Sequence, residues 1–198
     1  MNHYFKSNEN LEHKKAETEY GFGPVRFSFI TDAGVFSKGG VDFATDILLR
    51  RLPELSGEVL DLGCGFGCIG IVVAKLYGGN VSVTMSDINA RAVELAAKNA
   101  ELNGVRAKVV QSDGFGHIPG SFDAVITNPP IHAGKEVIYK LYAEAREHLK
   151  LGGRFFAVIQ KKHGALSHRQ KLEEIFGAAN TAVLYSKKGV LIFEIIKN

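Results

Sequence analysis

The sequence lacks the features that would place it in a membrane or outside the cell. Its 198 residues contain no apolar run near the roughly 20 residues that a membrane-spanning helix needs. The first 15 residues are polar and have no apolar signal-peptide core. These absences predict a cytoplasmic protein without a membrane partner.

Cysteine is also scarce. The two cysteines, Cys64 and Cys68, lie in one glycine-rich stretch that contains no histidine. A metal site would therefore be short of ligands, and we predict no metal. Both thiols are expected to be small buried side chains in a reducing compartment. The chain has no internal repeat and no low-complexity tract.

The composition is that of a globular domain, with 45% hydrophobic and 23% charged residues. The length predicts an N-terminal arm over residues 1–35 and one main domain over 36–198. Residues 1–134 carry 12 lysines and arginines against 15 acidic residues, whereas residues 135–198 carry 12 against six. The basic C-terminal part could face a polyanion, although the charge taken alone favours a merely solvated surface.

Strands and helices alternate along most of the chain. The stretch 20–30 is rich in β formers and is expected to be a short hairpin or an extended arm. A helix at 41–52 follows, and then strands at 58–62, 81–86, 107–110, 122–127 and 154–160. Helices are expected at 68–77, between Asn89 and Gly104, at 137–149 and at 167–176. Two further strands, 181–185 and 190–196, close the chain without a helix between them. The pattern predicts a doubly wound, mostly parallel α/β sheet of seven strands with a C-terminal antiparallel hairpin.

Glycines crowd the turn after the first of these core strands. They allow the backbone to approach a ligand closely, and the next helix begins there with its unpaired N–H groups. In one frame, Gly65-x-Gly67-x-x-Gly70 with a later Asp87 fits the dinucleotide fingerprint of a dehydrogenase. A lone match of this kind is a weak signal.

In a second frame, Asp61-x-Gly63-x-Gly65-x-Gly67 resembles motif I of class I S-adenosylmethionine methyltransferases. This frame is favoured because the strand ends at Leu62, so that Gly63 is the first loop glycine. Asp87 also supplies the acid that methyltransferases carry at the end of the second strand. The fold that this resemblance implies is the Rossmann-like class I methyltransferase fold.

The tetrapeptide Asn128-Pro129-Pro130-Ile131 follows the fourth core strand and is similar to the Asn-Pro-Pro-Tyr/Phe motif of amino-methylating enzymes. A conjugated exocyclic amine is a poor nucleophile because its lone pair is delocalised. Two fixed acceptors, the Asn128 side-chain oxygen and the Pro129 carbonyl, can bind its N–H groups and stabilise the developing charge. The prolines hold these acceptors rigidly. Taken alone, the motif could equally be a rigid turn.

Longer segments carry a resemblance to the "methyltransferase small" family, whose best-known members are ribosomal RNA guanine-N2 methyltransferases. The similarity covers roughly residues 18–198 and includes the segments 34–37, 41–45, 128–135 and 160–165. The chain departs from the family at Ile131, where an aromatic residue usually stacks on the target ring, and mildly at Ala44, where glycine is usual.

The resemblance implies a role for each cofactor residue. Asp61 would hold the ammonium side of the methionine moiety, N–H groups near Gly67 its carboxylate, and Asp87 both ribose hydroxyls. Asp113 would contact the adenine amino group. Simpler roles remain open, because Asp87 could cap the following helix and Asp113 could be a turn residue. The other implied cofactor contacts are Gly63, Gly65, Ile88, Gly114, Asn128, Phe36, Ser37, Lys38 and Thr45.

The predicted function is methylation of an exocyclic amine, with guanine N2 of ribosomal RNA as the first candidate. His132, Lys135, Lys161, Lys162 and His163, together with Arg169, would contact RNA phosphates, although each could be merely solvated. Three alternatives stay open: a protein-glutamine or small-molecule N-methyltransferase, a dehydrogenase that uses the overlapping glycine frame, and a non-catalytic RNA-binding protein on a methyltransferase scaffold.

Overall fold

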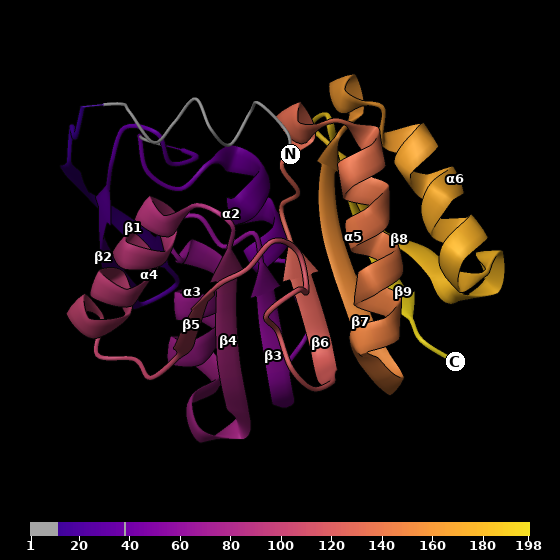
Figure 1. Ribbon diagram of the computed structural model, residues 1–198, viewed down its shortest axis with the longest axis horizontal. Helices are drawn as coiled ribbons and strands as arrows, with labels where there is room; N and C mark the ends of the chain where they lie inside the picture. Colours follow the sequence, from indigo (N-terminus) through magenta and orange to yellow (C-terminus); the bar gives the residue numbers. More distant parts are fainter. Residues whose placement is uncertain (1–11, 38) are drawn as a thin grey trace.

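A seven-stranded sheet organises the part of the chain that the structure describes, residues 12–37 and 39–198 of a computed structural model. The order is β5-β4-β3-β6-β7-β9-β8, with parallel pairs from β5 to β7 and β9 antiparallel to both neighbours (Figure 1). This confirms the predicted sheet. Its strands are β3 (Gly57–Leu62), β4 (Val81–Asp87), β5 (Lys108–Gln111), β6 (Phe122–Thr127), β7 (Leu149–Gln160), β8 (Thr181–Lys187) and β9 (Val190–Ile196).

Helices cover both faces of the sheet, because alternate side chains of each strand point to opposite faces. Leu60 and Leu62 of β3 pack in a core with α5 and α6, which lie side by side in Figure 1, whereas Val59 packs in a core with α2, α3 and α4. The helices are α2 (Phe43–Leu49), α3 (Cys68–Tyr77), α4 (Ala90–Leu102), α5 (Lys135–His148) and α6 (Ala165–Phe176). Short 3-10 turns are η1 (Gly78–Asn80), η2 (Ile131–Ala133), η3 (Lys161–His163) and η4 (Ala178–Asn180).

The predicted N-terminal hairpin is present as β1 (Ala16–Phe22) and β2 (Val25–Thr31). Phe27 and Phe29 of β2 are buried in the same core as α3 and α4, and the Phe29 ring meets Phe66 edge-on at 5.3 Å. The hairpin is thus packed onto the main domain. The predicted boundary between an arm at 1–35 and a domain at 36–198 stays a prediction.

The outer edge of β2 is bound by two amide side chains, one from α4 and one from the residue that caps its C-terminus. The Ile30 N–H donates to the Asn99 side-chain oxygen at 2.7 Å, and the Asn99 side-chain nitrogen donates to the Ile30 carbonyl at 2.9 Å. Asn103 bonds Ser28 in the same two-way manner, at 3.1 and 2.8 Å. Each amide offers a donor beside an acceptor, so two residues one helical turn apart take the place of a neighbouring strand.

Several predicted boundaries differ from the structure; the hairpin, for example, spans residues 16–31 and not 20–30. The helix predicted at 41–52 is regular only over Phe43–Leu49, and it begins at Phe43 because the Asp42 side chain caps it by accepting the N–H groups of Ala44 and Thr45. The strand predicted at 154–160 already begins at Leu149. Its first part is held by reciprocal backbone bonds in which Gly152 donates to Lys197 and Lys197 donates to Gly153.

Among the helices of the described ranges, none is long and apolar enough to cross a membrane. The cytoplasmic location stays a prediction. Cys64 and Cys68 are free and buried, as expected, and burial raises the pKa of each thiol well above its usual value.

Candidate active site at the carboxyl edge of the sheet

A large cleft opens at the carboxyl edge of the parallel strands. It encloses about 1260 Å³, including the part open to solvent, and residues that follow β3, β4, β5 and β6 and the last residue of β7 line it. A smaller cavity adjoins it and adds Ser37 and Thr45. The cleft brings together most predicted site residues: Phe36, Gly63, Gly65, Asp87, Ile88, Asp113, Gly114, Asn128, Pro129, Pro130, Ile131 and His132.

Six predicted site residues line neither cavity: Asp61, Gly67, Lys135, Lys161, Lys162 and Arg169. Lys38 lies outside the described residues. Unlike Gly63 and Gly65, which line the cleft, Gly67 packs against α4. Its φ is +93°, a Cβ there would lie 3.2 Å from the Ala96 Cα, and its N–H donates to the Cys64 carbonyl at 2.9 Å. Glycine at this position therefore permits the close approach of α4.

The glycine loop is hydrogen-bonded to the end of β4. The N–H groups of Gly63 and Cys64 donate to the Ser86 carbonyl at 2.8 and 2.9 Å, and the Gly65 N–H donates to the Asp87 carboxylate at 2.9 Å. Cys68 and Ile69, the first two residues of α3, line the smaller cavity. Since the first N–H groups of a helix have no partner within the helix, this end of α3 suits an anionic group.

Asp61 lies beneath this loop and is almost fully buried. One carboxylate oxygen accepts the Gly70 N–H at 2.8 Å, while the other has no partner among the described residues. Burial raises the pKa of Asp61 to about 7, the Gly70 bond opposes this rise, and the nearby Asp87 charge adds to it. This oxygen therefore keeps acceptor capacity for a hydrogen-bond donor.

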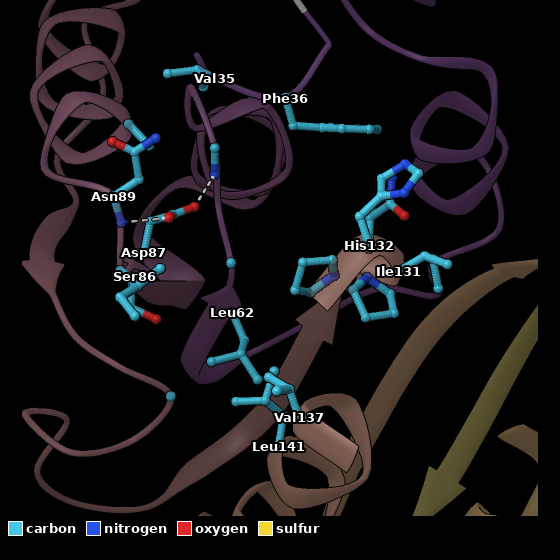
Figure 2. A pocket seen from close by; sticks show the side chains of 18 of the residues that line it. Val35, Phe36, Leu62, Ser86, Asp87, Asn89, Ile131, His132, Val137 and Leu141 are labelled. Atoms are coloured by element: carbon cyan, nitrogen blue, oxygen red, sulfur yellow. Dashed lines mark hydrogen bonds between the residues drawn. The ribbon is translucent and has the colours of Figure 1, made fainter. Parts of the chain in front are cut away.

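Asp87 joins the glycine loop to the start of α4. Its two oxygens accept the Gly65 and Asn89 N–H groups, each at 2.9 Å (Figure 2), and burial raises its pKa. Each carboxylate oxygen keeps capacity for a further donor. The cap of α4 is Asn89, whose side chain accepts the Arg91 N–H. The alternative in which Asp87 only caps the helix is therefore wrong.

The residues that follow β5 also line the cleft. Asp113 is exposed there, next to Ser112, whose hydroxyl donates to the Gly114 carbonyl at 2.9 Å. Gly114 has a φ of +54°, and a Cβ there would meet Leu141 at 2.9 Å. The exposed Asp113 carboxylate is thus available to a donor in the cleft.

The Asn128 side chain is hydrogen-bonded to the N-terminal end of α2 and to the residue that caps it. Its amide nitrogen donates to the Thr45 hydroxyl at 3.0 Å and to the Asp42 carboxylate at 3.3 Å. Because these contacts use the nitrogen, the amide oxygen remains for an amine in the cleft. Pro130 leads into η2, which places Ile131 and His132 along the same wall. Asn128 therefore combines exposure to the cleft with a defined amide orientation.

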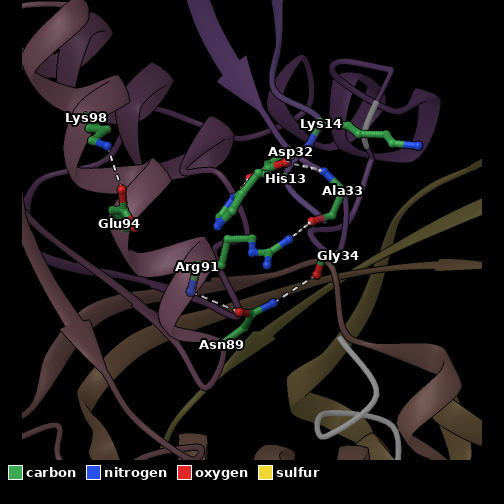
Figure 3. A network of polar contacts seen from close by, with 9 residues as sticks. All are labelled: His13, Lys14, Asp32, Ala33, Gly34, Asn89, Arg91, Glu94 and Lys98. Atoms are coloured by element: carbon green, nitrogen blue, oxygen red, sulfur yellow. Dashed lines mark hydrogen bonds and ion pairs between the residues drawn. The ribbon is translucent and has the colours of Figure 1, made fainter. Parts of the chain in front are cut away.

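The loop over residues 32–36 lines the cleft and is held by a polar network (Figure 3). Asp32 is fully buried and accepts from the Lys14 and Ala33 N–H groups at 2.6 and 2.7 Å, with the His13 ring at 2.5 Å. Burial would raise the pKa of Asp32, but these bonds outweigh it and lower the value. Arg91 binds the Ala33 carbonyl.

The loop ends at Phe36, whose ring is 60% exposed and lines both cavities. Figure 2 shows it extending over the cleft toward the side on which His132 lies. Asn89 fixes the loop by donating to the Gly34 carbonyl at 2.9 Å. A large exposed aromatic side chain on an anchored loop is suited to stack on a planar ligand.

Basic residues gather beside the Asn128 end of the cleft, on η2, η3 and the start of α5. Burial lowers the pKa of His163, and the charges of Lys162 and His132 add to the effect. Burial likewise lowers the pKa of His168 to about 4, with Lys135 and His163 contributing. Lys161 belongs to η3 as well. Arg169, which was also predicted to contact phosphates, forms an ion pair with Glu173 on its own helix at 2.8 Å.

Sequence reasoning missed Asp42 and Gln160 as cleft residues, whereas His163, which was expected in the phosphate-contacting rim, also lines the cleft. Gln160 ends β7, so its position at a strand terminus was a usable signal. Asp42 carried only the signal of a helix cap, and nothing local linked it to Asn128, which lies 86 residues away.

Known proteins share both the sequence and the fold. Residues 26–194 match the family described as "Methyltransferase small domain". The chain is 40% identical over 197 residues to the "Uncharacterized protein YbxB" of Bacillus subtilis (strain 168), covering 97% of this chain and 96% of that protein. It is 38% identical over 135 residues to the "Ribosomal RNA small subunit methyltransferase C" of Aeromonas hydrophila, covering 66% of this chain and 39% of that protein.

A solved structure of the T. thermophilus 16S rRNA N2 G1207 methyltransferase, in complex with AdoMet and guanosine, superposes with a TM-score of 0.83 at 28% identity. The match covers 93% of this chain and 51% of that one, so the chain spans about half or less of the length of these ribosomal RNA methyltransferases. The predicted resemblance to class I methyltransferases is thereby confirmed. The chain belongs to the methyltransferase small domain family.

Proposed function

We propose that this protein transfers a methyl group from S-adenosylmethionine to an exocyclic amino nitrogen of ribosomal RNA, with guanine N2 as the target. One observation carries the proposal: a single cleft joins the acidic end at Asp87 and Asp113 to the Asn128–Ile131 tetrapeptide. A nucleoside cofactor and a nucleobase would each meet the groups they need within that cleft.

The residues at the glycine loop fit the cofactor. Asp87 has acceptor capacity for ribose hydroxyls, and Asp113 for an adenine amino group. The unpartnered oxygen of Asp61 fits the ammonium of the methionine moiety, directly or through water. The first N–H groups of α3, at Cys68 and Ile69, fit its carboxylate. The cofactor would supply an electrophilic methyl group on a sulfonium.

The tetrapeptide fits an amine acceptor. The Asn128 amide oxygen and the Pro129 carbonyl would accept the two N–H groups and favour the tetrahedral nitrogen that attacks the methyl group. The nitrogen would gain the methyl group that the cofactor's sulfur loses, and the extra proton would leave the nitrogen for solvent. Asn128 and Pro129 thus orient the nitrogen, and no strong general base is required before transfer.

Two features favour RNA as the carrier of the amine. The exposed Phe36 ring at the mouth offers a stacking surface, which the tetrapeptide lacks because its fourth residue is Ile131. The basic residues His132, Lys135, Lys161 and Lys162 flank the same end and suit phosphates. The guanosine in the related Thermus structure supports guanine as the base.

Calorimetric titration with S-adenosylmethionine and with NAD is the first test. Binding of the methyl donor alone is expected. Labelled methyl groups should then appear in ribosomal RNA or small-subunit particles, and digestion to nucleosides should yield N2-methylguanosine. Label in protein glutamine or in small molecules alone would overturn the RNA assignment. Binding of RNA without any transfer would point to a non-catalytic scaffold.

A further inference from the structure

Asp42 and Thr45 of the α2 segment form a directional chain of hydrogen bonds with Asn128. One Asp42 oxygen caps α2 by accepting the Ala44 and Thr45 N–H groups, at 3.0 and 3.3 Å. The other accepts the Thr45 hydroxyl proton and also faces the Asn128 amide nitrogen at 3.3 Å. The Thr45 oxygen in turn accepts from that nitrogen at 3.0 Å.

The direction of this chain follows from Asp42. An ionised carboxylate only accepts hydrogen bonds, so the Thr45 hydroxyl must donate to it. The Thr45 oxygen then has only acceptor capacity left for Asn128. Thr45 is 5% exposed, so water competes little for these contacts. The nitrogen of the Asn128 amide must therefore face α2.

We propose that Asp42 and Thr45 are positioning residues that set the amide orientation of Asn128 and keep its oxygen in the cleft. The inference rests on the proposed function, in which that oxygen accepts an N–H of the target amine. An asparagine side chain is nearly symmetric in shape, and a flipped amide would meet the amine with its own N–H groups. The orientation therefore decides whether Asn128 attracts or repels the substrate nitrogen.

The sharpest test is Asp42→Asn, which has almost the same shape. Asparagine caps helices as well as aspartate does, so α2 is retained. Its new amide nitrogen would donate to the Thr45 oxygen, which frees the Thr45 hydroxyl proton for the Asn128 oxygen and reverses the chain. We expect kcat to fall about 10²-fold or more, the scale for losing one preorganised group. The dissociation constant of S-adenosylmethionine and the melting temperature should stay near the wild-type values.

Three further variants separate orientation from structure. Thr45→Val removes the hydroxyl at nearly constant volume and should lower kcat, whereas Thr45→Ser keeps the hydroxyl and should stay at least about tenfold closer to wild type. Asp46→Asn is the matched control on the same helix. Asp46 binds the Tyr20 hydroxyl and Arg50 and lines neither cavity, so kcat should change less than twofold.

A nuclear magnetic resonance measurement reads the orientation without any substrate. The side-chain NH₂ signals of Asn128, identified by their loss in Asn128→Asp, should shift and exchange faster with water in Asp42→Asn and Thr45→Val. Unchanged signals, or an active wild type whose Asp42→Asn variant keeps its kcat, would overturn the inference. Wild-type protein that methylates no RNA, yet shows the signal changes, would overturn the proposed function and leave the orienting role of Asp42 intact.

Discussion

At the scale of single residues, Asp61 combines burial with an acceptor that has no partner. Because its folded-state pKa is about 7 against an ordinary 3.8, the folded protein holds a proton there that the unfolded chain has lost. Its contribution to the free energy of unfolding should therefore fall as pH rises from about 4 to 7 and stay low above that. Asp61→Asn should remove this dependence.

The variant should be more stable than wild type at pH 8 by about 1–3 kcal/mol, the cost of leaving a buried polar group unsatisfied. The two proteins should converge toward pH 4, which urea unfolding at both pH values would measure. The same change should weaken binding of S-adenosylhomocysteine, which carries the ammonium group, at pH 8. A variant that loses stability at pH 8, or keeps full ligand affinity there, would show that Asp61 does not serve the ligand.

Phe36 is the second residue expected to contact a ligand, because it is exposed and lines both cavities. Base–aromatic stacking is worth about 1–3 kcal/mol, so Phe36→Ala should raise the KM for RNA roughly 5- to 150-fold. Phe36→Trp should retain a low KM. The affinity for the methyl donor should hold, and calorimetry would check it. Phe43→Ala is the matched control, since Phe43 is 51% exposed but lines neither cavity. A loss of donor affinity instead would assign Phe36 to the cofactor, as the family resemblance implied.

At the scale of elements, the hairpin depends on Asn99. This side chain is fully buried and also donates to the Phe66 carbonyl at 2.8 Å, so it joins β2, α4 and the glycine loop. Asn99→Ala should lower the free energy of unfolding by about 2–4 kcal/mol, because buried partners would be left unsatisfied. Denaturant unfolding would measure the loss.

Asn103→Ala provides the comparison at the end of the same helix. Asn103 is the C-cap residue of α4, and its bonds to Ser28 are exposed, so water can replace them. The expected loss is about 1 kcal/mol or less. Equal losses for the two variants would mean that helix α4, and not the buried contact with β2, responds to the mutation.

At the scale of the whole molecule, charge is distributed unevenly around the cleft. If Lys135, Lys161 and Lys162 contact phosphates, each change to Gln should weaken RNA binding and reduce the slope of log K against log salt by about one. Binding titrations between low and moderate salt would give the slopes. Lys150→Gln is the control, because Lys150 is the second residue of β7 and so lies at the amino edge of the strand, away from the cleft. It forms an ion pair with Asp123. Unaltered slopes for the three rim variants would leave them as solvated surface.

The sequence alone determined the order of the elements and the positions of the motifs at strand ends. The glycine loop, Asp87 and the Asn128 tetrapeptide each lie at the carboxyl end of a parallel strand, and such ends share one edge. The cleft could be predicted for that reason, because local periodicity and turn residues locate strand ends.

Only the tertiary structure decided which distant side chains meet. The contact of Asp42 with Asn128 joins positions 86 apart, and that of Asn99 with Ile30 joins positions 69 apart. It also decided that Gly67 serves packing and that Arg169 pairs within its own helix. Such contacts depend on how helices and strands pack against one another, and a local sequence pattern carries no record of that packing.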